Sequence, residues 1–77
     1  MNAELRSILA DTLGIPEADL AEAASTETIP EWDSVAHINI VLSLEACYGL
    51  SFTPDEILSL GSMKEILRVL HQRGVVV

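Results

Sequence analysis

Three side chains whose types and spacing suit nucleophilic chemistry lie near the middle of the chain. Asp33 and Ser34 are adjacent, and His37 follows three residues after the serine. On a helix Ser34 and His37 would be neighbours, so the imidazole could serve as a base toward the hydroxyl. The chain has no Gly-x-Ser-x-Gly turn and no recognisable set of oxyanion donors. Hydrolysis is therefore the least favoured function, and His37 is interpreted as a residue of the helix surface or the core edge.

The residues that could bind metal or react with oxidants are too scattered to form a site. His37, Cys47 and His71 lack the spacing of zinc ligands, and no glycine-rich phosphate-binding loop is present. The single cysteine excludes an internal disulfide and suits a reducing compartment. Because Cys47 shares a helix face with Leu44 and Tyr48, it is predicted to lie in the core.

The serine belongs to the longest helix that the sequence predicts. Asp33 and Ser34 are both favoured at a helix N-cap, and residues 34–48 contain no proline or glycine before Gly49. A helical projection at about 100° per residue places a wide apolar face on one side. This expected core face contains Ile40, Val41, Leu44, Cys47 and Tyr48.

A second apolar face of this helix has no role in a plain helical bundle. It contains Val35, Ile38 and Leu42, which project away from the core face, and Ser34 lies on the boundary between the two faces. Local rules favour Ser34 as an ordinary helix cap, but Asp33 can already fill that position. The hydroxyl and the apolar stripe together indicate a surface that meets another molecule.

The segment before this helix predicts a first helix and a long loop. Asn2 can cap the first helix, and Gly14 followed by Pro16 ends it. Its buried stripe is expected to contain Leu5, Ile8, Leu9 and Leu13. Residues 15–33 form the loop, which Leu20 and Ile29 anchor in the core. The loop ends directly before Ser34, at the start of the second predicted helix.

The segment after Gly49 predicts two more helices. Thr53 and Ser62 each begin a capping box, the first for a short helix to about Leu60 and the second for a last helix that ends at Gly74. The last helix is expected to bury Met63, Ile66, Leu67 and Leu70. The expected fold is all-α: a small antiparallel four-helix bundle of three main helices and one short helix, with a long loop between the first two.

Composition limits the function. The 77 residues suffice for a single domain, 1–77, and a domain of this size is too small for a deep enclosed active site. An apolar fraction of 49% favours a folded domain over a disordered chain. Twelve acidic and four basic residues give a net charge of −8, which disfavours nucleic acid and favours basic protein partners. The chain shows no secretion signal and no apolar run of membrane-spanning length. A cytoplasmic monomer without membrane insertion is expected.

The tripeptide Asp33-Ser34-Val35, preceded by Trp32 and followed by an apolar helix, resembles the prosthetic-group site of acyl carrier proteins. In that family the motif is Asp-Ser-Leu, at the start of the second helix of a small acidic four-helix bundle. The resemblance covers almost the whole chain. The first helix, the acidic loop, residues 52–57 at the short helix and residues 62–70 of the last helix follow the family's order.

The resemblance implies a carrier and not an enzyme. A phosphopantetheinyl transferase would move 4'-phosphopantetheine from coenzyme A onto the Ser34 hydroxyl, and the arm would hold an acyl group as a thioester for acyl-loading and acyl-processing enzymes. Asp33, Val35, Ile38 and Leu42 are then the expected partner contacts. A phosphodiester at a helix N-terminus also meets unpaired backbone amides and the positive end of the helix dipole.

Two departures from the family pattern shape this expectation. Val35 stands where the family usually has leucine, and Glu45 is the one acid of a helix that in general fatty-acid carriers holds several. A stand-alone carrier for a dedicated fatty-acid, polyketide or other secondary pathway is therefore favoured. A peptidyl, aminoacyl or D-alanyl-type carrier stays open. So does an unmodified helical module that docks a partner through Val35, Ile38 and Leu42.

Overall fold

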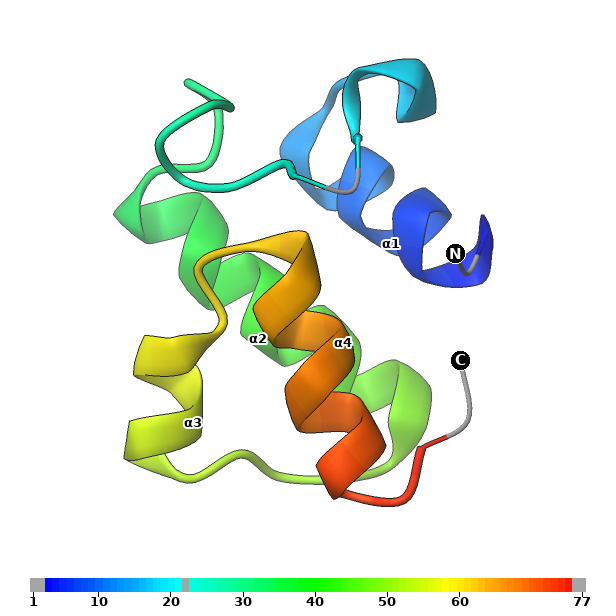
Figure 1. Cartoon of the computed structure of the whole chain (residues 1–77), viewed down its shortest axis with the longest axis vertical. Helices are drawn as coiled ribbons and strands as arrows, with labels where there is room; N and C mark the ends of the chain where they lie inside the picture. The colour runs from blue at the N-terminus through cyan, green and yellow to red at the C-terminus, as the bar shows by residue number, and fades with distance from the viewer. Residues whose placement is uncertain (1–2, 22, 76–77) are drawn as a thin grey trace.

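The computed structural model describes residues 3–21 and 23–75. These residues form four α-helices and one short 3-10 helix between α1 and α2 (Figure 1). Their bounds are α1 Ala3–Leu13, η1 Glu17–Asp19, α2 Ser34–Tyr48, α3 Pro54–Ser59 and α4 Met63–Gln72. The predicted all-α fold of three main helices and one short helix is confirmed. None of the helices in the described ranges is long and apolar enough to cross a membrane.

The directions of the helices differ in one respect from the prediction. Figure 1 shows α1 running against α2, and α3 returning toward the end of the molecule where α2 begins. Because α3 takes up this return path, α4 then runs in the same general direction as α2. The prediction of a wholly antiparallel bundle is therefore wrong for the last helix.

The first helix packs against α2 through its predicted stripe. Leu5, Leu9 and Leu13 are buried, and the half-buried Ile8 packs on the same core. Gly14 adopts a left-handed conformation with a φ of 70° directly after α1, which confirms it as the stop signal. The predicted cap of this helix, Asn2, lies outside the described residues.

The long loop is anchored more firmly than its sequence indicates. Leu20 and Ile29 are buried as predicted, and Trp32, 2% exposed, joins them in the core. Two backbone hydrogen bonds also tie the loop to the turn between α3 and α4. The Thr26 N–H donates to the Gly61 carbonyl over 3.0 Å, and the Met63 N–H donates to the Ala24 carbonyl over 2.9 Å. The loop is therefore held against both the core and the α3–α4 turn before α2 begins.

The buried face of α2 is narrower than the projection predicts. Ile40, Val41 and Leu44 are buried and Tyr48 is half-buried, but Cys47 is exposed. The prediction that Cys47 lies in the core is therefore wrong. Cys47 lies in the last turn of α2, at the edge of the apolar face whose centre is Leu44.

The caps of α3 and α4 differ in completeness. Thr53 and Glu56 form the predicted capping box, in which each side chain accepts the other residue's backbone N–H. The Thr53 N–H, and then Arg73, hold the pKa of the Glu56 carboxyl below its usual value. Ser62 caps α4 as predicted, but the carboxylate of Glu65 pairs with Arg68. Only half of the second predicted box therefore forms.

The predicted core face of the last helix is largely confirmed. Met63, Ile66 and Leu70 are fully buried, while Leu67 is half-buried and packs at the edge of the core. Leu60, which follows α3, is also fully buried. These side chains join those of α1, α2 and the long loop in one hydrophobic core.

Candidate functional site

Ser34 is the first residue of α2, and its hydroxyl is exposed. The helix is capped by the residue before it, because the Asp33 side chain accepts the Ala36 N–H over 2.9 Å. Among the described residues, nothing forms a hydrogen bond with the Ser34 hydroxyl. The local interpretation of Ser34 as the helix cap is therefore wrong, and its hydroxyl is not needed by the fold.

The two adjacent residues should respond differently to truncation. Asp33→Ala removes the cap and is expected to lower the free energy of unfolding by about 1 kcal/mol. Ser34→Ala removes a hydroxyl without a structural partner and should stay within about 0.5 kcal/mol of the wild type. Urea denaturation of the two variants measures both effects. A larger loss for Ser34→Ala than for Asp33→Ala would contradict the assignment of the cap.

The second apolar face of α2 is exposed, as predicted. Val35 is 71% exposed, Ile38 53% and Leu42 58%. A fourth large apolar side chain, Leu58 on α3, is 82% exposed. The sequence analysis missed Leu58. Its signal was the pair Ile57-Leu58 in a six-residue helix, because adjacent helical residues project about 100° apart and cannot both face the core.

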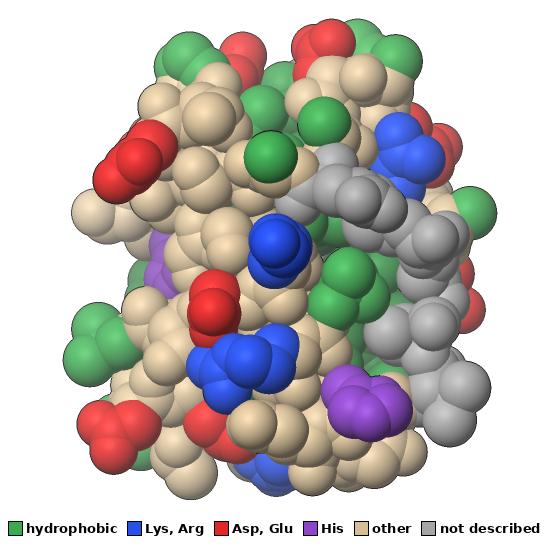
Figure 2. All heavy atoms as spheres, in the orientation of Figure 1, with side chains coloured by type: hydrophobic (Ala, Val, Ile, Leu, Met, Phe, Trp, Pro, Cys, Tyr) green, Lys and Arg blue, Asp and Glu red, His purple; other side chains and the backbone are tan. Residues whose placement is uncertain are grey.

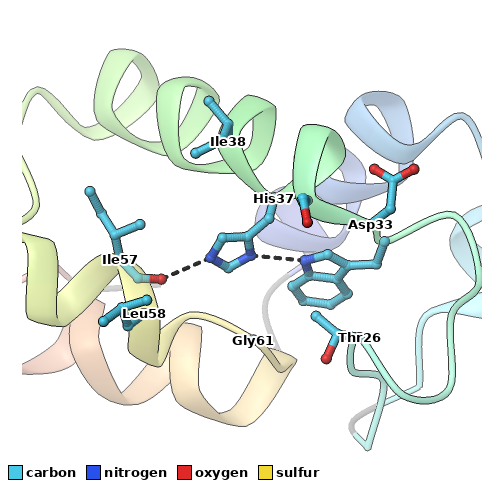
Figure 3. A pocket seen from close by; sticks show the side chains of 9 residues that line it. Thr26, Asp33, His37, Ile38, Ile57, Leu58 and Gly61 are labelled. Carbon is cyan, nitrogen blue, oxygen red and sulfur yellow. Dashed lines mark hydrogen bonds between the residues drawn. The ribbon is translucent and has the colours of Figure 1, made fainter.

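An open cleft of about 550 Å³ lies between the start of α2, the end of α3 and the long loop. This volume is within the range of roughly 300–1,000 Å³ that is usual for small-molecule sites. Asp33 and Ser34 line it on the side of the loop and α2, and Ile38, Ile57 and Leu58 supply apolar walls. Figure 3 shows Ile38 on α2, and Ile57 and Leu58 on α3, among the side chains that line the cleft. A group attached to Ser34 would begin inside this cleft.

A hydrogen-bonded link joins the loop, α2 and α3 in this cleft. The indole Nε1–H of Trp32 donates to His37 Nδ1 over 3.1 Å, and His37 Nε2 lies 2.8 Å from the carbonyl oxygen of Ile57 (Figure 3). Because an indole nitrogen can only donate and a carbonyl can only accept, Nδ1 is the acceptor and Nε2 the donor of the imidazole in this set. The indole and imidazole rings lie at 24° to each other, with their centroids 6.5 Å apart. We call this set the Trp32–His37–Ile57 link.

The hydrogen bonds of this link determine whether His37 can act as a base toward Ser34. Both of its ring nitrogens are occupied, so neither is free to accept the proton of the Ser34 hydroxyl in this conformation. His37 is half-buried, which confirms the prediction that it lies at the core edge. Glu45, the single acid of α2, also has a structural role, since its carboxylate accepts the Phe52 N–H over 2.8 Å.

Charge is distributed unevenly around the site. The chain has no lysine or arginine between Arg6 and Lys64, so the loop, α2 and α3 contain no basic residue. Figure 2 shows basic side chains over the face along which α4 runs. Two of them, Arg68 and Arg73, are already paired with glutamates. The loop, α2 and α3, which surround the cleft, therefore present a surface that attracts basic protein partners.

None of the known family models matches the chain.

Proposed function

We propose that this protein is an acyl carrier whose prosthetic group, phosphopantetheine, is attached to Ser34. The observation that carries the proposal is the Ser34 hydroxyl. It is exposed at the start of α2 and lines an apolar cleft. It has no structural role, because Asp33 caps the helix. The Asp33-Ser34-Val35 motif and its similarity to the acyl carrier family support the same function.

The residues around Ser34 fit a phosphodiester. The backbone N–H groups of Ser34 and Val35 have no hydrogen-bond partner among the described residues, since the Asp33 carboxylate takes the Ala36 N–H. Unpaired amides at a helix N-terminus, together with the positive end of the helix dipole, stabilise an anion bound there. When bound, the prosthetic group supplies a terminal thiol that holds an acyl group as a thioester.

Attachment is a phosphoryl-type transfer in which Ser34 is the nucleophile. The Ser34 oxygen forms a bond to the phosphorus that bears the pantetheine half of coenzyme A, and the pyrophosphate P–O bond breaks. The adenosine bisphosphate half leaves, and the hydroxyl proton passes to the transferase. His37 cannot supply this base while both of its nitrogens are occupied, so the step requires an external enzyme.

The proposal is tested by the intact mass of the protein after incubation with coenzyme A, magnesium and a broad-specificity phosphopantetheinyl transferase. The wild type is expected to gain one phosphopantetheine, and Ser34→Ala none. Ser51→Ala is the matched control, because Ser51 is also exposed but lies in a loop. It should gain the group as the wild type does.

One observation favours a second function. Val35, Ile38 and Leu42 on α2 and Leu58 on α3 are exposed apolar side chains of the kind that an unmodified docking module would also present to a partner helix. Such a module does not need the Ser34 hydroxyl. Failure of the wild type to gain mass, under conditions that modify a known carrier, would make this the leading function.

The apolar stripe of α2 should determine how well partner enzymes recognise the carrier. Ile38→Glu places a charge on a side chain that is 53% exposed, so helicity should be unchanged. The kcat/KM of a partner enzyme acting on the loaded carrier should fall about tenfold, the equivalent of roughly 1.4 kcal/mol of lost contact. Gln72→Glu adds the same charge at an exposed position of α4 and should leave kcat/KM unchanged. Equal kinetics for both variants would remove Ile38 from the contact surface.

A further inference from the structure

The short helix α3 depends on contacts outside itself for its position. It has six residues, and none of its side chains is buried. A helix of this length is unstable alone in water, because too few hydrogen bonds form to offset the cost of the first turn. Buried side chains flank it, with Phe52 before the helix and Leu60 after it. These two side chains anchor the ends of α3 in the core and leave its rotation about its own axis to other contacts.

The two ends of α3 are held by different partners. At the start of the helix, Arg73 donates hydrogen bonds to the Glu56 carboxylate and to the Ser51 carbonyl, which ties this end to the end of α4. Toward the other end, the His37 Nε2–H donates to the Ile57 carbonyl over 2.8 Å. This is the only hydrogen bond between α2 and α3 in the part of the chain that the structure describes.

The Ile57 carbonyl is one that the helix itself does not satisfy well. It lies in the last turn of α3, where carbonyl groups lack the usual donor four residues further on. The Leu60 N–H approaches it over 3.3 Å, so His37 is the closer of its two donors. The indole of Trp32 donates to the other ring nitrogen and thereby keeps the imidazole turned toward α3 (Figure 3).

The rotation of α3 decides which of its side chains lies toward solvent beside Ser34. Ile57 is half-buried and packs against the core. Leu58 follows it about 100° further around the helix and is 82% exposed. Both side chains line the same cleft as Ser34. A turn of α3 about its axis would therefore move Leu58 and change the surface next to the serine.

We infer that His37 is a positioning residue: its hydrogen bond to the Ile57 carbonyl fixes α3 against the start of α2, and with it the surface that Leu58 presents beside Ser34. His37 acts through α3 and does not touch the reacting atoms. Its part in recognition rests on the proposed function, because the enzyme that contacts this surface is taken to be the transferase that modifies Ser34.

Two substitutions at His37 separate the hydrogen bond from the volume of the side chain. His37→Phe keeps an aromatic ring without a donor, whereas His37→Gln keeps an N–H group at a similar distance from the backbone. The exchange of the backbone amide hydrogens of residues 57–60 is measured by NMR. His37→Phe should speed this exchange about fivefold, a factor typical of one lost hydrogen bond, and His37→Gln by less than about twofold. Equal exchange rates in the two variants would overturn the inference.

A second measurement on the wild type covers the case in which His37→Phe does not fold. The nitrogen chemical shifts of an imidazole show which ring nitrogen carries the proton. His71 is the only other histidine and is exposed, so His71→Gln assigns the signals of His37. The neutral ring of His37 should carry its proton on Nε2. A neutral ring with its proton on Nδ1 could not donate to Ile57 and would also overturn the inference.

The kinetics of the transferase test whether the position of α3 matters for recognition. His37→Phe should raise the KM for the carrier about threefold, because α3 must be brought back into place when the enzyme binds. The kcat should not change, since Ser34 and its neighbouring cap, Asp33, are unaltered. His37→Gln should restore the KM of the wild type. A lower kcat with an unchanged KM would overturn the positioning role.

The role of His37 and the carrier function can fail separately. Transferase loading of Ser34, with equal amide exchange in the two His37 variants, would retain the carrier and reject His37 as the residue that positions α3. Faster exchange in His37→Phe alone, without any loading of the wild type, would retain the position of α3 and reject the carrier.

Discussion

Replacing Trp32 with alanine is expected to lower the free energy of unfolding by about 3–5 kcal/mol, the cost typical of removing a buried aromatic side chain. Trp32 is 2% exposed, and its indole donates the hydrogen bond that fixes the His37 ring. The substitution therefore leaves a cavity and also an unpaired acceptor at His37 Nδ1. Small domains are stable by only about 5–15 kcal/mol, so a large part of the stability should be lost.

Urea denaturation measures this effect, and Trp32→Phe separates its two causes. Phenylalanine keeps most of the buried ring but cannot donate to His37, so its loss should be smaller than that of alanine. A loss below about 1 kcal/mol for Trp32→Ala would mean that the loop does not anchor in the core through this side chain.

The second large effect is expected at the centre of the buried face of α2. Leu44 is fully buried, so Leu44→Ala should lower the free energy of unfolding by about 2–5 kcal/mol. Leu42 lies two residues earlier on the same helix and is 58% exposed. Leu42→Ala should therefore change the stability by no more than about 0.5 kcal/mol. Equal losses for the two variants would contradict the orientation of α2.

Local signals were sufficient to predict most of the helical framework. The caps at Thr53 and Ser62 and the stop at Gly14 follow from interactions within a few residues of the chain, whereas at α2 the same local rules favoured Ser34 over the actual cap, Asp33. The exposed stripe of α2 followed from helical periodicity, because residues of one face recur every three or four positions. Ser34 was placed correctly at the start of α2 for the same reason.

The features that the sequence did not reveal depend on contacts between distant segments. The His37 side chain meets the Ile57 carbonyl across twenty positions of sequence, and no local pattern encodes that distance. Leu58 is exposed because Ile57 and Leu60 already supply the core side of the short α3. Cys47 is exposed because it lies at the edge of the apolar arc, whereas Tyr48, one residue further along the helix, still packs against the core.

The carrier function is tested most directly by locating the added mass within the protein. After incubation with coenzyme A and a phosphopantetheinyl transferase, the intact protein is fragmented in the mass spectrometer. One phosphopantetheine is expected on Ser34, with every other serine unmodified. A wild type that gains no mass beside a modified known carrier, or a gain that persists in Ser34→Ala, would contradict the carrier function.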